Sequence, residues 1–183
     1  MAIRVIAGEC KGFMLKGPPG DGTRPILARV RKSLFDILAP DLRDAVFLDM
    51  FCGTGAVGIE ALSRGAKKLV SVEMDSAVVD CVNWNLNYSK MKERATVFSA
   101  DVFEFLKNYD SEKFDIVFAG PPYPAYLCGQ ILEGLNECSF LKEETIIILQ
   151  HYMKEITPSE VGKLSKYREK KYGDTILSFY EIK

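Results

Sequence analysis

The sequence predicts an α/β fold with a mixed, mostly parallel sheet of seven strands. From residue 45 onward, five short apolar segments alternate with segments of helical periodicity. The apolar segments are nearly continuous, as expected of parallel strands that helices cover on both faces. Two further segments at the end of the chain flank a short turn, which predicts an antiparallel hairpin at one edge of the sheet.

The composition indicates a single soluble domain. Its 183 residues are enough to bury a hydrophobic core, and no apolar run approaches the roughly 20 residues of a membrane span. The first residues lack the apolar segment of a signal peptide. The five cysteines include no C-x-x-C pair and there is one histidine, so reduced thiols and no metal site are expected. We therefore expect a cytoplasmic protein without a membrane anchor, and a monomer.

The first 44 residues are predicted to form an extension that precedes the alternating segments. Residues 3–16 alternate loosely around two glycines, which indicates a short β-hairpin, and the Gly/Pro-rich residues 17–22 indicate a loop. A helix is then expected to start at Thr23-Arg24-Pro25 and to end at Ala39-Pro40. Its buried face is predicted from apolar residues that recur every four positions, namely Ile26, Val30, Leu34 and Leu38.

Basic residues are concentrated in the same extension, although the whole chain has 24 basic and 25 acidic residues. A local basic patch can meet phosphate groups even on a nearly neutral protein. The alternative is an ordinary solvated surface. The candidate phosphate-binding residues are Arg4, Lys11, Arg24, Arg29, Arg31 and Lys32. The last four of these are expected on one exposed side of the helix.

Residues 45–183 supply the strands and helices of the predicted sheet. After a strand that runs to Asp49 and a helix over 56–63, the expected strands are 68–73, 95–99, 114–118 and 144–150. The expected helices are 76–88, 102–107 and 127–137, and in the first of these Ala77, Cys81, Trp84 and Tyr88 recur near helical spacing. The final hairpin is predicted from residues 163–171 and 175–182.

The loop after the first of these strands carries the main ligand-binding signal. Gly53 to Gly58 satisfies G-x-G-x-x-G, and glycines there let a ligand approach the backbone and the start of a helix. A dinucleotide site places its glycine turn almost directly on the strand end, whereas Met50, Phe51 and Cys52 here separate Asp49 from Gly53. The spacing Asp-x-Phe-x-Gly-x-Gly resembles the first motif of S-adenosylmethionine-dependent methyltransferases.

Acidic residues end the next two predicted strands. Glu73 can accept hydrogen bonds from both hydroxyls of a ribose, although dinucleotide enzymes place an acid similarly. Asp101 can accept from an adenine amino group, or can be an ordinary helix cap. The candidate cofactor-binding residues are these acids, the residues that follow them and the loop: Asp49, Phe51, Cys52, Gly53, Thr54, Gly55, Glu73, Met74, Asp101 and Val102.

Gly120, Pro121, Pro122 and Tyr123 follow the fourth strand and are the candidate catalytic residues. They resemble the [Asp/Asn/Ser]-Pro-Pro-[Tyr/Phe] signature of methyltransferases that act on exocyclic amines of nucleobases and on glutamine amides. Such an amine is a poor nucleophile, so acceptors must hold its N–H bonds while an aromatic ring stacks on the extruded base. In isolation, the segment can also be a simple proline turn. Gly120 stands where the signature has a polar side chain, so one of the two acceptors is missing.

The resemblance extends over nearly the whole chain and is to the RsmD family, bacterial enzymes that methylate N2 of one guanine in 16S rRNA. The segments that carry it are Arg4-Val5-Ile6-Ala7-Gly8, Arg24-Pro25, Arg29-Val30-Arg31, residues 48–55, residues 58–63 and Glu73-Met74-Asp75. It implies a Rossmann-like, class I methyltransferase domain that binds S-adenosyl-L-methionine over 45–183. It also implies an RNA-contacting extension over 1–44 and the small ribosomal subunit as partner. The family usually has Asp at the position of Gly120.

Three functional hypotheses follow from the sequence. The first is an active 16S rRNA guanine-N2 methyltransferase. The second is a non-catalytic RNA-binding protein on the same fold, which Gly120 favours. The third is a methyltransferase for DNA or protein amides, which would not explain the basic extension. His151, just past the fifth strand, is a weak candidate for a base, and Cys52 is interpreted as a small loop residue.

Overall fold

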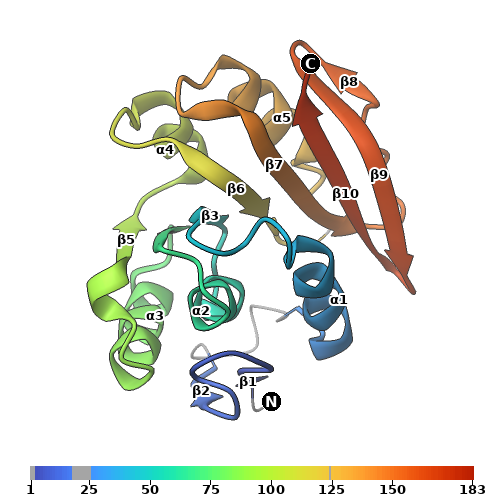
Figure 1. Cartoon of the computed structure of the whole chain (residues 1–183). Helices are drawn as coiled ribbons and strands as arrows, with labels where there is room; N and C mark the ends of the chain where they lie inside the picture. The colour runs from blue at the N-terminus through green and yellow to red at the C-terminus, as the bar shows by residue number, and fades with distance from the viewer. Residues whose placement is uncertain (1–2, 18–25, 124) are drawn as a thin grey trace.

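The computed structural model describes residues 3–17, 26–123 and 125–183. In this part of the chain, eight strands form one sheet in the order β5-β4-β3-β6-β7-β10-β9-β8, and β1 and β2 form a separate hairpin (Figure 1). The strands are β1 (Ile3–Arg4), β2 (Met14–Leu15), β3 (Val46–Met50), β4 (Lys68–Glu73), β5 (Ala95–Ser99), β6 (Phe114–Ala119), β7 (Leu141–Tyr152), β8 (Glu160–Val161), β9 (Leu164–Tyr172) and β10 (Thr175–Ile182). The helices are α1 (Ala28–Leu38), α2 (Ala56–Ser63), α3 (Ser76–Tyr88), the 3-10 turn η1 (Lys92–Arg94), α4 (Val102–Asn108) and α5 (Cys128–Glu137).

The sheet is mixed and mostly parallel, as predicted. β5, β4, β3, β6 and β7 pair in parallel, whereas β10 pairs antiparallel with both β7 and β9. In the described residues this sheet has eight strands rather than the predicted seven, because the two-residue strand β8 pairs with the start of β9. A two-residue strand is too short to show an apolar pattern of its own.

Most elements begin and end within a few residues of the predicted positions. The largest difference among the strands is β7, which starts at Leu141 rather than at residue 144, because polar residues at its amino-terminal end conceal the strand. No helix in the described residues is both long enough and apolar enough to cross a membrane.

Helices cover both faces of the sheet, so the central strands β3, β4 and β6 are buried on both sides, whereas the outer strands β5 and β9 are partly exposed. Figure 1 shows α1, α2 and α3 on one face and α4 and α5 on the other. Two hydrophobic clusters correspond to these layers. The first joins α1, α2 and α3 to inward residues such as Phe47 and Phe118, and the second joins α4 and α5 to Leu48 and Val117. Alternate residues of each strand therefore enter opposite cores.

The hairpin β1-β2 packs on the first of these cores. Ile3, Val5, Cys10 and Leu15 are buried in the same cluster as α1 and α2. The predicted division of the chain at residue 44 stays a prediction, but the described residues on the two sides of it share one hydrophobic core. The described residues of the extension are thus packed directly against the core of the sheet.

Helix α1 begins later than the sequence predicts. Its first helical residue is Ala28, and Leu27 before it is extended, with φ −61° and ψ 137°. The expected start at residues 23–25 was wrong in this respect, and Arg24 and Pro25 themselves lie outside the described residues. The end of the helix and three residues of its buried face, Val30, Leu34 and Leu38, are confirmed. Ile26 was predicted wrongly, since it precedes the helix and is half-buried.

Helix α3 faces the sheet with Val78, Val82 and Leu86, which are buried. Of the residues whose spacing indicates this helix, Cys81 is buried and Ala77, Trp84 and Tyr88 are exposed. Trp84 and Tyr88 instead stack on each other at a centroid distance of 5.1 Å, and the Lys16 ammonium lies 4.0 Å from the Trp84 ring centroid. The large aromatic residues therefore join α3 to the end of the hairpin.

Glu60 in α2 is fully buried and holds the extension in place. Its carboxylate accepts hydrogen bonds from the backbone N–H of Ile6 at 2.8 Å, from that of Ala7 at 3.0 Å and from Arg64 Nε at 2.7 Å. It also pairs with Arg31 Nε at 3.7 Å, and Arg31 in turn donates to the Arg4 carbonyl. A buried charge is stable only when paired and hydrogen-bonded in this way.

We predict that Glu60→Ala lowers the free energy of unfolding by about 3–5 kcal/mol, because it leaves the buried Arg31 guanidinium without its counter-charge. Urea unfolding of the two proteins measures the difference. Glu133→Ala, which removes an exposed carboxylate from α5, is the matched control and is expected to change the free energy by less than about 0.5 kcal/mol. Equal effects of the two changes would contradict the role given to Glu60.

Candidate functional site

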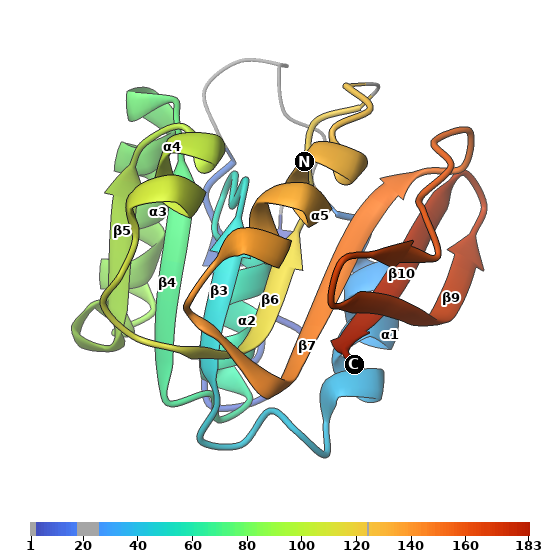
Figure 2. The same ribbon diagram turned by 90° about the horizontal axis from the view of Figure 1, so that it is seen from above.

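The carboxyl ends of β3, β4 and β6 meet at one edge of the sheet, which Figure 2 shows with the strand arrowheads together. In open α/β sheets, ligands bind at this edge. The loop between β3 and α2 takes an unusual backbone path there, with positive φ at Phe51 (59°), Gly53 (53°) and Gly55 (74°). A non-glycine residue with positive φ costs free energy, and such residues are enriched at functional sites.

Asp49 lies beneath this loop and does not project into solvent. Its side chain is 1% exposed, and Oδ2 accepts the backbone N–H of Gly58 at 2.9 Å. Gly55, the cap residue of α2, has no side chain, so Asp49 supplies the acceptor that the first turn of the helix needs. Gly58 must lack a side chain, because a Cβ there would lie 2.6 Å from Leu69 Cδ2.

Burial is the main cause that raises the pKa of Asp49; the hydrogen bond from Gly58 opposes it, the charge of Glu73 adds to it, and the resulting pKa is about 7. The Asp49 carboxylate therefore has a mainly structural role, which is to hold the first turn of α2 through Gly58. A direct contact between Asp49, one of the candidate cofactor-binding residues, and a ligand does not agree with this burial.

Glu73 binds the glycine loop from the neighbouring strand. Oε2 accepts from Gly53 N at 3.0 Å, and Oε1 accepts from Met74 N at 2.9 Å and Asp75 N at 3.1 Å. A carboxylate has about four acceptor positions, so capacity remains for a ligand hydroxyl. Glu73 is half-buried at the edge of the sheet, with Met74 beside it 70% exposed.

Asp101 is the cap of α4, as one of its two interpretations predicts. Oδ1 accepts from Phe103 N at 2.8 Å and from Glu104 N at 3.2 Å. Val102 after it is buried. A cofactor contact by Asp101 stays a prediction and would involve the other carboxylate oxygen.

Thr54 and Cys52 are buried inside the glycine loop. Burial raises the pKa of the Cys52 thiol well above its usual range, which agrees with a small, neutral loop residue. Asn85 in α3, which the sequence reasoning missed, holds this loop: its Nδ2 donates to the Thr54 carbonyl at 2.9 Å, and its Oδ1 accepts from Lys16 N at 2.8 Å. Because this asparagine looks like any polar helix residue in the sequence, no local signal identifies it.

The Gly120–Tyr123 segment starts directly beside this loop. Gly120 N donates to the carbonyl of Met50, the last residue of β3, at 3.3 Å. Pro121 is buried and Pro122 exposed. The Tyr123 hydroxyl accepts from Gln150 Nε2 at 3.4 Å, and the Tyr123 ring lies 6.0 Å from that of Tyr152. The structure thus brings the predicted cofactor residues and the predicted catalytic residues to one edge.

His151 does not face this site. It is buried, its Nδ1 is 3.1 Å from the Tyr152 carbonyl and its Nε2 is 2.9 Å from Ser178 Oγ. Burial lowers the pKa of the imidazole. A buried histidine with both ring nitrogens engaged is a structural residue.

The predicted basic residues separate into exposed and buried ones. Arg4, Lys11, Arg29 and Lys32 are exposed, and Lys32 pairs with Asp36 at 2.6 Å. Arg31 is only 2% exposed and pairs with Glu60, so its placement on the exposed side of the helix was wrong. The cause is a long-range ion pair that the helical pattern does not reveal.

Strand β9 adds basic residues next to α1, as the side-by-side positions of α1 and the β9-β10 hairpin in Figure 1 show. The pKa of Asp36 is lowered mainly by the hydrogen bond from Lys32, and the charge of Lys170 in β9 contributes to the shift. Arg29 Nη2 reaches the turn between β9 and β10, 3.4 Å from where a Cβ on Gly173 would lie. Arg29, Lys32 and Lys170 thus form one basic surface, which we call the α1-β9 surface.

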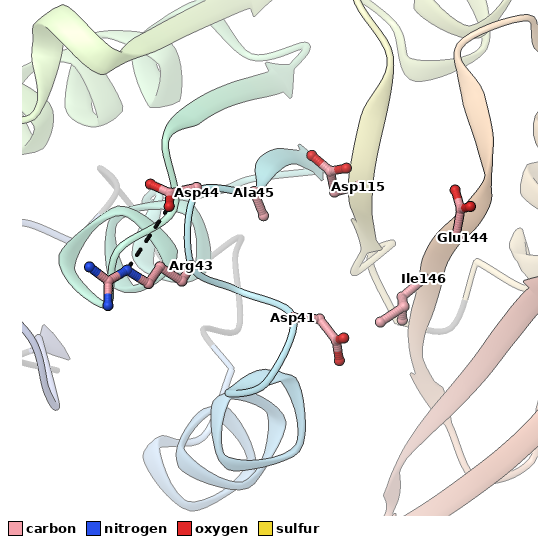
Figure 3. Close-up of a pocket in the computed structure, with 7 residues that line it drawn as sticks. All are labelled: Asp41, Arg43, Asp44, Ala45, Asp115, Glu144 and Ile146. Atoms are coloured by element: carbon pink, nitrogen blue, oxygen red, sulfur yellow. Dashed lines mark ion pairs between the residues drawn. The ribbon is translucent and has the colours of Figure 1, made fainter.

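A hollow on the molecule lies at the opposite, amino-terminal edge of the sheet (Figure 3). Of its acidic residues, Asp115 has structural partners: it accepts from Val46 N at 2.8 Å and pairs with Lys142. The hollow is away from the glycine loop and is not a candidate ligand site. Its lining residues are Asp41, Arg43, Asp44, Ala45, Asp115, Glu144 and Ile146.

The sheet order, the glycine loop after the first parallel strand and the Pro-Pro-Tyr segment at the same edge define a Rossmann-like, class I methyltransferase fold. Comparisons with known proteins agree. The family model described as Conserved hypothetical protein 95 matches residues 3–181. The chain therefore belongs to this family, the RsmD family.

Curated relatives carry ribosomal RNA methyltransferase names. Ribosomal RNA small subunit methyltransferase D of Escherichia coli is 35% identical over 98% of this chain and 89% of its own. The protein of the same name from Haemophilus influenzae is 36% identical over 81% of this chain and 78% of its own. The solved structure of yhhF from Escherichia coli, described as a methyltransferase, superimposes with a TM-score of 0.88 at 34% identity and covers 100% of this chain and 99% of that one.

We predict that Asp49 makes folding depend on pH. Its pKa is about 7 in the folded protein and about 3.9 when unfolded, so the folded state binds more protons between these values and stability falls as pH rises from about 4 to 7. Asp49→Asn keeps an acceptor for Gly58 but does not titrate. Urea unfolding should show wild-type stability falling relative to that of the variant by up to about 1.4 kcal/mol per pH unit. A constant difference across this range would contradict the prediction.

Proposed function

We propose that this protein transfers a methyl group from S-adenosyl-L-methionine to the exocyclic N2 of one guanine in 16S rRNA of the small ribosomal subunit. The observation that carries the proposal is the hydrogen bond between Gly120 and Met50, which holds the start of the Pro-Pro-Tyr segment beside the glycine loop. A methyl donor bound on the loop and a base bound by the segment would then be adjacent. Family membership supports an rRNA methyltransferase over other methyltransferases.

The residues at the loop suit S-adenosylmethionine better than a phosphate-bearing dinucleotide. The carboxylate that holds the loop at the edge of the sheet is Glu73, which favours hydroxyl and amine donors over phosphate. Glu73 would hold the ribose hydroxyls, and Asp101 the adenine amine. Phe51 and Met74 would cover the adenine ring with apolar surface. When bound, the cofactor supplies an electrophilic methyl group on a sulfonium.

The Pro-Pro-Tyr segment would bind the target base. The carbonyl of Pro121 would accept one N–H of the exocyclic amine, so that the nitrogen lone pair is freed from the ring. The Tyr123 ring would stack on the extruded base, and its hydroxyl is already held by Gln150. A carbonyl acceptor fixed at this place favours an amine over a ring carbonyl as the target.

The α1-β9 surface and the hairpin would contact the phosphates of the RNA. Arg29 lies at the end of α1 that is next to the β9-β10 turn, and this turn adjoins the carboxyl end of β7 through the pairing of Thr175 with Tyr152. The basic surface therefore adjoins the proposed active edge. Arg4 and Lys11 would extend it along the hairpin, and Arg24, outside the described residues, is proposed on sequence grounds alone. The protein would act in the cytoplasm as a monomer.

A non-catalytic RNA-binding protein is the second candidate, and Gly120 is the observation that favours it. Glycine offers no side-chain acceptor at the reacting centre. A methyltransferase for DNA or protein amides would share the Pro-Pro-Tyr chemistry but would leave the α1-β9 surface without a purpose.

The decisive experiment incubates the protein and tritiated S-adenosylmethionine with small ribosomal subunits from cells that lack this protein. We expect label in 16S rRNA, none in large subunits, and strongly reduced label with Glu73→Ala. Label in ribosomal protein or DNA would support the third hypothesis. Tight RNA binding without any transfer would support the non-catalytic one.

We predict that the double variant Arg29→Ala, Lys32→Ala binds RNA more weakly and that its affinity depends less steeply on salt, so that the magnitude of the slope of log affinity against log salt is smaller. The slope should fall by about 0.7–0.9 for each phosphate that the variant no longer neutralises, because fewer counterions are then released from the RNA. A salt titration of RNA binding measures the slope. Affinity for S-adenosylmethionine should not change.

The matched control is Arg43→Ala with Lys113→Ala, which removes two exposed positive charges near the amino-terminal edge of the sheet. It should leave the slope as in the wild type. If both double variants lower the slope equally, the α1-β9 surface has no special role and only net charge matters.

A further inference from the structure

Gln150 lies beside Gly120 on the neighbouring strand. β6 and β7 pair in parallel, with Ala119 opposite Leu149, so the next residues along the two strands are Gly120 and Gln150. Neighbouring strands are about 4.8 Å apart, and residues in register point to the same face. Phe118 and Ile148, two residues earlier, enter the first core cluster together, which places both Gly120 and Gln150 on that face.

Among the described residues, only one of the two polar atoms of the Gln150 side chain has a hydrogen-bond partner. Nε2 donates to the Tyr123 hydroxyl at 3.4 Å, whereas Oε1 is buried and has no hydrogen-bond partner in the described part of the chain. A buried acceptor without a partner destabilises a protein, so most such atoms have one. This unpaired acceptor is on a side chain that Tyr123, the proposed stacking residue, already holds.

Two other ways of replacing the missing acceptor are disfavoured. His151 has both ring nitrogens engaged, with Tyr152 and Ser178. The other possibility is that the backbone at position 120 has a shape that only glycine can adopt. This is not so, because Gly120 does not have positive φ. A Cβ there would lie 3.3 Å from Phe118 Cε1, so a small shift of that ring would make room for a side chain. Position 120 thus lacks a hydrogen-bond acceptor although the backbone could carry one, and the neighbouring Gln150 side chain has an acceptor without a partner in the described residues.

We propose that Gln150 Oε1 accepts one N–H of the target amine and so performs the role that a polar residue at position 120 would have. This rests on the proposed function. The Pro121 carbonyl accepts the other N–H, and the Tyr123 hydroxyl holds the carboxamide in orientation. Gln150 is then a substrate-contacting residue supplied by β7 instead of β6.

The chemistry balances without an additional base. The amine lone pair forms the new N–C bond while the methyl–sulfur bond breaks, and sulfur keeps that electron pair. The amine then carries one proton too many. A neutral carboxamide can orient an N–H bond but cannot take the proton, which therefore leaves to water. A neutral acceptor also makes weaker hydrogen bonds than a carboxylate does, so methyl transfer should be slower than with Asp at position 120.

A double-mutant cycle tests the proposal, with single-turnover methyl transfer to small subunits at saturating S-adenosylmethionine as the measurement. The four proteins are the wild type, Gln150→Leu, Gly120→Asp and the double variant. We expect Gln150→Leu to lower the rate about 100-fold in the wild-type background. In the Gly120→Asp background the same change should lower it by less than about 3-fold, because the new carboxylate supplies the acceptor.

Controls separate loss of the acceptor from loss of structure. Gln130→Leu makes the same chemical change at an exposed position of α5 and should leave the rate unchanged. Calorimetry should give the same cofactor affinity for all four proteins. Gln150→Met, an unbranched replacement of similar length, should reproduce the loss if Gln150→Leu does not fold.

Equal losses in the two backgrounds would overturn the proposal, because Gln150 would then act through structure alone. The proposal would also be overturned if Gln150→Leu or Gln150→Met left the rate of the wild-type background unchanged while Gly120→Asp transferred methyl groups. In that case the proposed function would stand. Absence of transfer to 16S rRNA by every protein of the set would overturn the proposed function and this inference together.

Discussion

The buried carboxylate of Glu60 is the interaction on which the arrangement of this molecule depends. It accepts hydrogen bonds from the backbone of Ile6 and Ala7, and it pairs with Arg31 of α1. One side chain of α2 therefore joins the hairpin and α1 to the helix that packs on the sheet. Ser63 at the end of the same helix reinforces this junction, since its Oγ donates to the Ala7 carbonyl at 2.6 Å and accepts from Cys10 N at 2.9 Å.

This arrangement has a functional consequence, because α2 is also the helix whose first turn closes the glycine loop. Asp49 holds that first turn through Gly58, and Asn85 ties Thr54 to the end of the hairpin at Lys16. The extension proposed to bind RNA and the loop proposed to bind the cofactor are thus both attached to one short helix. A rigid connection between them sets where a bound RNA presents its base, which is what orientation requires in catalysis.

Much of the fold and of the site could be predicted from the sequence, because apolar runs and glycine turns are local signals. β4 and α3 have the predicted bounds, and the predicted cofactor and catalytic segments meet at one edge. The burial of Arg31 could not be predicted, because its partner Glu60 is far along the chain and looks like an exposed residue of an apolar helix. The same holds for Gln150, whose position beside Gly120 follows only from the order and register of the strands.

The most direct test of the account is to identify the product nucleoside. Small subunits from cells that lack this protein would be incubated with the protein and S-adenosylmethionine. Their 16S rRNA, taken before and after incubation, would be digested and analysed by mass spectrometry. The account predicts the appearance of N2-methylguanosine at a single position. A methyl group on adenine, cytosine, ribose or a protein amide, or RNA that stays unmodified under prolonged incubation, would contradict it.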